Sequence, residues 1–102
     1  SNAIARSIRN IIFTARGDKP FNPFFGSRVS ELLFDPMDQI TTLAIKTEIE
    51  ETIKNFEPRV DLKEVQVDPS YDDNEYSVVI NYEIIGIDVE PQQLTFALEL
   101  TR

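Results

Sequence analysis

The stretch Asn55-Phe56-Glu57-Pro58-Arg59-Val60 decides how this chain folds, because one pattern of apolar residues ends there and another begins. Before it, apolar residues recur at helical spacing; after it, they alternate with polar residues as in a strand. Pro58 has no backbone N–H donor and disfavours helical geometry at Glu57, so we expect a helix to end at this point. Glu57 and Arg59 then flank a rigid corner. This corner is either a polar handle for a partner or a helix terminator with two solvated charges.

The helical pattern before the corner predicts the longest helix of the chain, running to Phe56. Asp35 is expected to cap this helix and Pro36 to occupy its first position. One apolar stripe of this helix is expected to face inward. A second set of mostly apolar residues widens the buried face, and the charged side chains are expected to stay in water. The stripe comprises Ile40, Leu43, Ala44, Thr47 and Glu51, the second set Ile45, Ile49, Ile53 and Phe56, and the solvated residues Lys46, Glu48, Glu50 and Lys54.

Three strands are predicted after the corner, because three segments alternate apolar with polar residues and are separated by turns. The first segment changes phase at Lys63-Glu64, which is typical of a β-bulge. Short connections between successive strands favour an antiparallel meander. The predicted strands cover residues 60–67, 76–84 and 94–101, with turns at 69–74 and 86–91.

The amino-terminal part predicts two further helices. Residues 4–15 form an amphipathic pattern of about three turns, and residues 28–34 form a short helix with Ser27 as its N-cap. We therefore predict an α+β fold of two layers, with helices packed on one face of a three-stranded antiparallel meander. Residues 1–3 are interpreted as the remnant of an expression tag, which leaves residues 4–102 as a single domain.

Composition excludes several kinds of chemistry. The chain of 102 residues contains no cysteine and no histidine, so it has no disulfide, no thiolate nucleophile and no imidazole base or ligand. It also lacks an apolar run long enough to span a membrane, so we expect no membrane insertion. Carboxylates, hydroxyls, lysine and arginine remain for any chemistry.

The net charge of −8 is unevenly distributed along the chain. Residues 1–34 carry a balance of +3 and the remainder carries −11. This distribution argues against a nucleic-acid partner, because phosphate binding requires basic surface over most of the contact. It suits a protein that meets different protein partners at its two ends. The alternative explanation is that these charges only keep the protein soluble.

The many acidic residues suggest two chemical functions to test, glycoside hydrolysis and calcium binding. A glycosidase requires two carboxylates about 5–10 Å apart, one of them with a raised pKa. Glu57 stands beside an apolar residue and a proline, but the nearby Arg59 is expected to lower its pKa. The acids at 68–75 lack the spacing and central glycine of an EF-hand. We therefore predict no enzymatic activity, no cofactor, no metal and no small-molecule substrate.

Two motifs together resemble one known family. The first is Thr14-Ala15-Arg16-Gly17-Asp18-Lys19-Pro20-Phe21-Asn22-Pro23-Phe24-Phe25-Gly26, and the second is the corner sequence at residues 55–60. In combination they are similar to the small baseplate wedge proteins of contractile-tailed phages. Some members of that family are labelled lysozyme-like, and the small baseplate subunit of type VI secretion systems is a relative. The resemblance covers nearly the whole chain after residue 3.

This resemblance implies a structural component of a tail baseplate, located in the virion tail and assembled in the host cytoplasm. Its expected partners are larger wedge proteins, which dock on the helical side, and the tail sheath protein, which pairs with an open sheet edge. Two alternatives stay open: a tail-associated peptidoglycan hydrolase, and a type VI secretion baseplate subunit. The residues expected to bind partners are Glu57, Pro58, Arg59, Phe21, Pro23, Gly26 and Arg16.

The role of Arg59 has two readings at this point. Its guanidinium has the geometry to form a bidentate pair with a partner carboxylate. It can also form an internal pair with Glu57 or with the end of the helix. The aromatic side chains at Phe21, Phe24 and Phe25 have a similar ambiguity, since they can fill the core or a groove on a partner.

Overall fold

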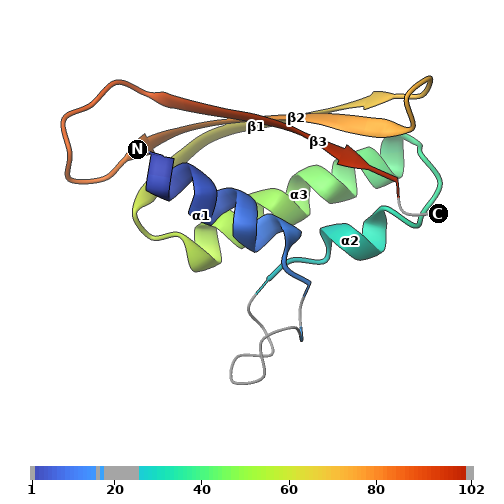
Figure 1. Cartoon of the computed structure of the whole chain (residues 1–102), viewed down its shortest axis with the longest axis horizontal. Coiled ribbons are helices and arrows are strands. Elements are labelled where there is room, and N and C mark those ends of the chain that lie inside the picture. The colour runs from blue at the N-terminus through green and yellow to red at the C-terminus, as the bar shows by residue number, and fades with distance from the viewer. Residues whose placement is uncertain (1, 16, 18–25, 101–102) are drawn as a thin grey trace.

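The structure is a computed structural model that describes residues 2–15, 17 and 26–100. Within these residues, three helices are followed by three strands, and the helices all lie against the same face of the sheet (Figure 1). The elements are α1 (Asn2–Phe13), α2 (Val29–Leu32), α3 (Gln39–Phe56), β1 (Val60–Ser70), β2 (Glu75–Ile84) and β3 (Gln92–Glu99).

The sheet is an antiparallel meander in the order β1-β2-β3. The register of β1 against β2 shifts between Leu62 and Glu64, which confirms the predicted bulge. Every second residue of β2 faces the helices and is buried, as the alternation predicts. The predicted α+β class, with helices on one face of a three-stranded sheet, is therefore confirmed. The buried residues of β2 are Tyr76, Val78, Ile80, Tyr82 and Ile84.

The start of α3 corrects one prediction. Asp38 caps the helix in place of Asp35, and the helix begins at Gln39 rather than at Pro36. Asp38 has extended backbone geometry, so its carboxylate reaches back and accepts a hydrogen bond of 2.8 Å from the Thr41 N–H. This bond lowers the pKa of Asp38. The helix ends at Phe56, as the proline at position 58 predicts.

The buried side of α3 corrects a second prediction. The face that packs on the sheet and the other helices is defined by Ile45, Ile49 and Ile53, spaced one helical turn apart and each at most 1% exposed. The stripe expected to lie in the core begins with Ile40 and Leu43, which are 80% and 63% exposed. That expectation was wrong: α3 has two apolar stripes, and the described residues of the chain cover one of them.

The core lies between α1, α3 and the sheet. Helix α1 contributes the isoleucines that its amphipathic pattern predicted, which are Ile4, Ile8, Ile11 and Ile12. Helix α2 is shorter than predicted, and Arg28 rather than Ser27 occupies its N-cap position. No helix in the described ranges has the length and apolar composition that crossing a membrane requires.

Candidate partner-docking site

Glu57 lies inside the protein at the end of α3, with 3% of its surface exposed. It is the C-cap residue of the helix, and its backbone N–H donates to the carbonyl of Ile53 at 2.9 Å. Pro58 follows and has no N–H with which to continue the helix. The chain therefore turns directly after Glu57, and the turn holds its carboxylate against the core.

Three hydrogen bonds hold the Glu57 carboxylate. The Arg59 guanidinium donates twice, from Nε to Oε1 at 2.5 Å and from Nη2 to Oε2 at 3.0 Å. The hydroxyl of Ser7 on α1 donates to Oε2 at 2.7 Å. A bidentate arginine–carboxylate pair is geometrically specific and stronger than a neutral hydrogen bond. Arg59 thus forms the internal pair that was one of its two expected roles, and Ser7 ties that pair to the first helix.

The electrostatics of Glu57 are the opposite of what an acid role in hydrolysis requires. The hydrogen bonds from Arg59 lower the pKa of Glu57, and they outweigh its burial, which acts in the opposite direction. The Ser7 hydrogen bond lowers that pKa further. The sequence-based expectation for Glu57 is confirmed on this point. A general acid in a glycosidase needs a raised pKa, so this carboxylate has the opposite property.

Backbone contacts fix the corner from a second direction. The carbonyl of Arg59 accepts a hydrogen bond of 2.9 Å from the N–H of Ile85, which directly follows β2. The Val60 N–H lies 3.4 Å from the carbonyl of Glu57. Burial raises the pKa of Tyr82 on β2, and the negative charge of Glu57 adds to that effect. The corner is therefore connected to α1, to α3 and to the end of the central strand.

Arginine side chains are exposed at the corner and on helix α1. Arg59 keeps 53% of its side chain exposed while it pairs with Glu57. A groove of about 740 Å³ runs along α1 beside Ser7, so the groove and the Glu57 pair share a residue. The guanidinium of Arg9 lies 5.2 Å from the ring centre of Phe13. The residues that line the groove are Ala3, Arg6, Ser7, Arg9, Asn10 and Phe13.

Gly26, the last residue of the first family motif, occupies a position where a side chain would not fit. Its φ is 121°, and a Cβ at this position would lie 2.5 Å from the carbonyl oxygen of Thr14. The N–H of Ser27 donates to that same oxygen at 2.8 Å, and a parallel bridge joins Ala15 to Ser27. The two ends of the loop therefore meet at the end of α1. Three predicted partner-binding residues, Arg16, Phe21 and Pro23, lie outside the described residues.

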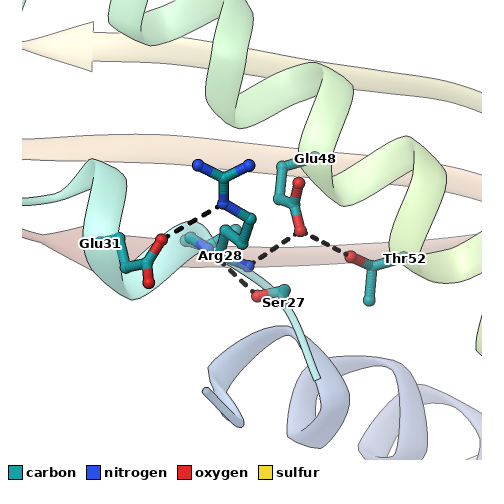
Figure 2. A network of polar contacts seen from close by, with 6 residues as sticks. Ser27, Arg28, Glu31, Glu48 and Thr52 are labelled. Atoms are coloured by element: carbon teal, nitrogen blue, oxygen red, sulfur yellow. Dashed lines mark hydrogen bonds and ion pairs between the residues drawn. The ribbon is translucent and has the colours of Figure 1, made fainter. Parts of the chain in front are cut away.

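A second buried carboxylate was missed by sequence reasoning. Glu48, which was expected to stay in water, is 8% exposed and accepts the backbone N–H of Arg28 at 2.8 Å. Figure 2 shows its Oε2 between this N–H and the hydroxyl of Thr52, which lies at 3.5 Å. A helical wheel drawn through Ile45 and Thr52 places Glu48 on the same face, and that was the available signal.

Glu48 and Ser27 together fix the segment that enters α2. The Ser27 hydroxyl donates to the carbonyl of Ile12 at 2.6 Å and lies 3.3 Å from the N–H of Val29. The Arg28 side chain points outward to Glu31 at 3.2 Å, which Figure 2 shows on the side opposite to Thr52. Within the part of the chain that the structure describes, no group of three or more acidic residues is placed to hold a metal ion.

Comparison with known proteins identifies relatives over most of the chain. A family model described as baseplate wedge protein gp25 matches residues 1–89. The baseplate wedge protein gp25 of Enterobacteria phage T4 is 35% identical over 96 residues, which are 94% of this chain and 73% of the phage protein. A crystal structure of a protein from Geobacter sulfurreducens, described as a candidate tail lysozyme, superposes with a TM-score of 0.88 at 27% identity. That match covers 99% of this chain and 91% of the other.

Two more distant structures share the fold. A chain of the type VI secretion baseplate complex superposes with a TM-score of 0.80 at 13% identity, over 99% of this chain and 93% of that one. A chain of the postcontracted pyocin R2 baseplate gives a TM-score of 0.63 at 18% identity, over 97% and 84% of the two chains. At these identities the likeness concerns the fold alone.

Proposed function

We propose that this chain, which belongs to the baseplate wedge protein gp25 family, acts as a structural joint in the baseplate of a contractile tail. It holds larger wedge proteins on its helical side and offers a sheet edge to the tail sheath. It has no catalytic turnover. Residues 4–102 act as one unit in this role. The relative from phage T4 favours a phage tail over a type VI secretion system.

The observation that carries this proposal is that the two charged residues of the corner differ in exposure. The Glu57 carboxylate is fully engaged inside the protein, while the Arg59 side chain stays half exposed beside the α1 groove. Arg6 and Arg9 line that groove. We propose that the exposed side chains of Arg6, Arg9 and Arg59 together offer a basic surface on a chain with a net charge of −8. Such a surface attracts a partner helix that carries carboxylates, and the bonded corner sets the angle at which the partner is held.

The sheath contact is proposed at β3. This strand is paired only with β2 in the described sheet, and its outer edge is defended by few charges. Thr95, Ala97 and Glu99 are exposed along it. A strand from a partner can add to such an edge, where backbone hydrogen bonds give affinity and the alternating side chains give register.

Co-purification with the larger wedge protein of the same tail tests the helical contact. The variant Arg6→Ala/Arg9→Ala removes two exposed cations without touching the Glu57 hydrogen bonds. The variant Lys54→Ala/Lys63→Ala removes the same amount of charge elsewhere on the surface and serves as the control. We expect the first variant to lose the complex at physiological salt and the second to retain it. Retention by both variants contradicts the proposed docking surface.

A further inference from the structure

The exposed stripe of α3 forms a second surface that the corner does not explain. Ile40 is 80% exposed and Leu43 is 63% exposed, although both are large apolar residues of helix α3. Together with Ala44 and Thr47 they follow the spacing i, i+3, i+4 and i+7, which is the seam of a helix that packs on another helix. Leu43 lies 13 positions before the end of α3, so the stripe is about 20 Å from the corner.

Grooves lie on both sides of Leu43. One groove, of about 450 Å³, is bounded by Leu32 of α2 and by Ile40 and Ala44 of α3. The other, of about 310 Å³, is bounded by Val67 of β1 and by Tyr71, which is 59% exposed. Leu43 lines both and forms the ridge between them. A ridge with a groove on each side is the surface onto which a second helix packs, with its own rows of side chains in the grooves.

Each of these grooves is lined by one cationic residue. Arg28 lines the first groove and Lys46 lines the second, so a cation stands on each side of the Leu43 ridge. The acidic residue in the lining is Glu48, which is buried and directed to the Arg28 backbone. The ion pair of Arg28 with Glu31 is exposed at both ends, and such pairs are weak enough to exchange partners.

We propose that the Leu43 ridge binds an amphipathic helix of another protein, whose apolar seam is flanked by carboxylates. The apolar seam fills the two grooves, and the carboxylates meet Arg28 and Lys46. A second copy of this chain fits less well. In a two-fold contact centred on Leu43, both protomers would bring the same cations to one interface. This surface is separate from the corner, so the proposal does not depend on the function proposed for Arg59.

Two synthetic helical peptides test the proposal by fluorescence anisotropy against the full chain. Both have leucines along one face; one has glutamates beside the leucines, and the other has lysines there. We expect saturable binding of the glutamate peptide and binding of the lysine peptide weaker by about tenfold or more. The variant Leu43→Ser should weaken binding of the glutamate peptide by about tenfold or more. Ile87→Ser removes a residue of similar exposure, 58%, from the β2–β3 connection and should leave binding unchanged.

Charge-reversal variants provide a second, independent test of the proposal. Lys46→Glu should weaken binding of the glutamate peptide and strengthen binding of the lysine peptide. Lys54→Glu, elsewhere on the same helix, should change the binding of neither peptide. Circular dichroism of each variant establishes that the fold is retained. Three results overturn the proposal: no saturable binding of the glutamate peptide, equal binding by Leu43→Ser, or sedimentation that shows a dimer which Leu43→Ser dissolves. The last result would assign the ridge to a second copy of this chain.

Discussion

The hydroxyl of Ser7 donates a hydrogen bond of 2.7 Å to the carboxylate of Glu57, which lies 50 positions later in the sequence. This bond joins the first helix to the turn where the last helix meets the sheet. Because Arg59 donates to the same carboxylate, the bonds of Glu57 link the first helix to the Arg59 guanidinium.

Replacing Ser7 with alanine should destabilise the protein. The change removes one hydrogen bond to a buried, ionised carboxylate, and such bonds contribute about 2 kcal/mol to the free energy of unfolding. Urea denaturation followed by circular dichroism measures the loss. Ser77→Ala provides the control, because Ser77 is exposed on β2 and its replacement should change the stability by no more than about 0.5 kcal/mol. Equal stability of the two variants would show that the Ser7 bond contributes nothing.

The stability of the fold should fall in acid through Glu57. The pKa of this residue is lower in the folded protein than its ordinary value of 4.5, so the unfolded chain binds more protons as the pH falls. The contribution of Glu57 is therefore fully present above about pH 5 and is lost as the pH falls through the folded pKa. Denaturation midpoints measured from pH 7 down to pH 3 follow this loss.

The variant Glu57→Gln separates this effect from other acidic groups. Its stability should depend less on pH over the same range, although a slope from Asp38 should remain because the pKa of that capping residue is also lowered. A pH dependence identical to that of the unmodified protein would contradict the assignment of the acid sensitivity to Glu57.

Gly26→Ala should be more costly than Gly86→Ala. Both positions have positive φ, so alanine adds backbone strain at either one. At Gly26 a Cβ also meets the Thr14 carbonyl at 2.5 Å, whereas at Gly86 nothing lies within 4 Å. We expect about 1 kcal/mol at Gly86 and at least about twice that at Gly26. Thermal or urea denaturation of the two variants gives the comparison, and equal losses would show that the Thr14 contact is unimportant.

The protein should not lyse cell walls. The hydrogen bonds of Arg59 lower the pKa of Glu57, whereas the general acid of a glycosidase needs a raised pKa. A turbidity assay on purified peptidoglycan measures lysis directly. Clear lysis that disappears in Glu57→Gln would refute the structural role and support the hydrolase that the name of the Geobacter relative implies.

Much of the fold could be predicted from local patterns. Proline at position 58 ends α3 because of its own geometry, and the alternation in β2 and β3 leaves a single choice of buried face. The beginning of α3 was mispredicted because Asp35 and Asp38 both suit an N-cap. The extended backbone at Asp38 decides between them, and residues 35–37 are used to connect α2 with α3.

The candidate site was less predictable, since its contacts join distant parts of the chain. The pairing of Glu57 with Arg59 is local and was among the expected alternatives, but Ser7 gave no signal of its own. The helical wheel places Glu48 on the buried face of α3, but its partner, the backbone N–H of Arg28, lies 20 positions earlier in the sequence and gave no signal. The two apolar stripes of α3 look alike in the sequence. Periodicity detects both and does not tell which of them the rest of the chain covers. That Pro58, Arg59, Gly26 and the loop residues bind partners stays a prediction.

The measurement that tests the central claim most directly is the affinity of the larger wedge protein for Glu57→Gln/Arg59→Ala. This double variant removes the exposed arginine without leaving an unpaired buried carboxylate, so the fold can be kept and checked by circular dichroism. We predict that the folded variant binds at least about tenfold more weakly than the unmodified chain. Unchanged affinity in a folded variant would contradict the claim that the corner orients a partner.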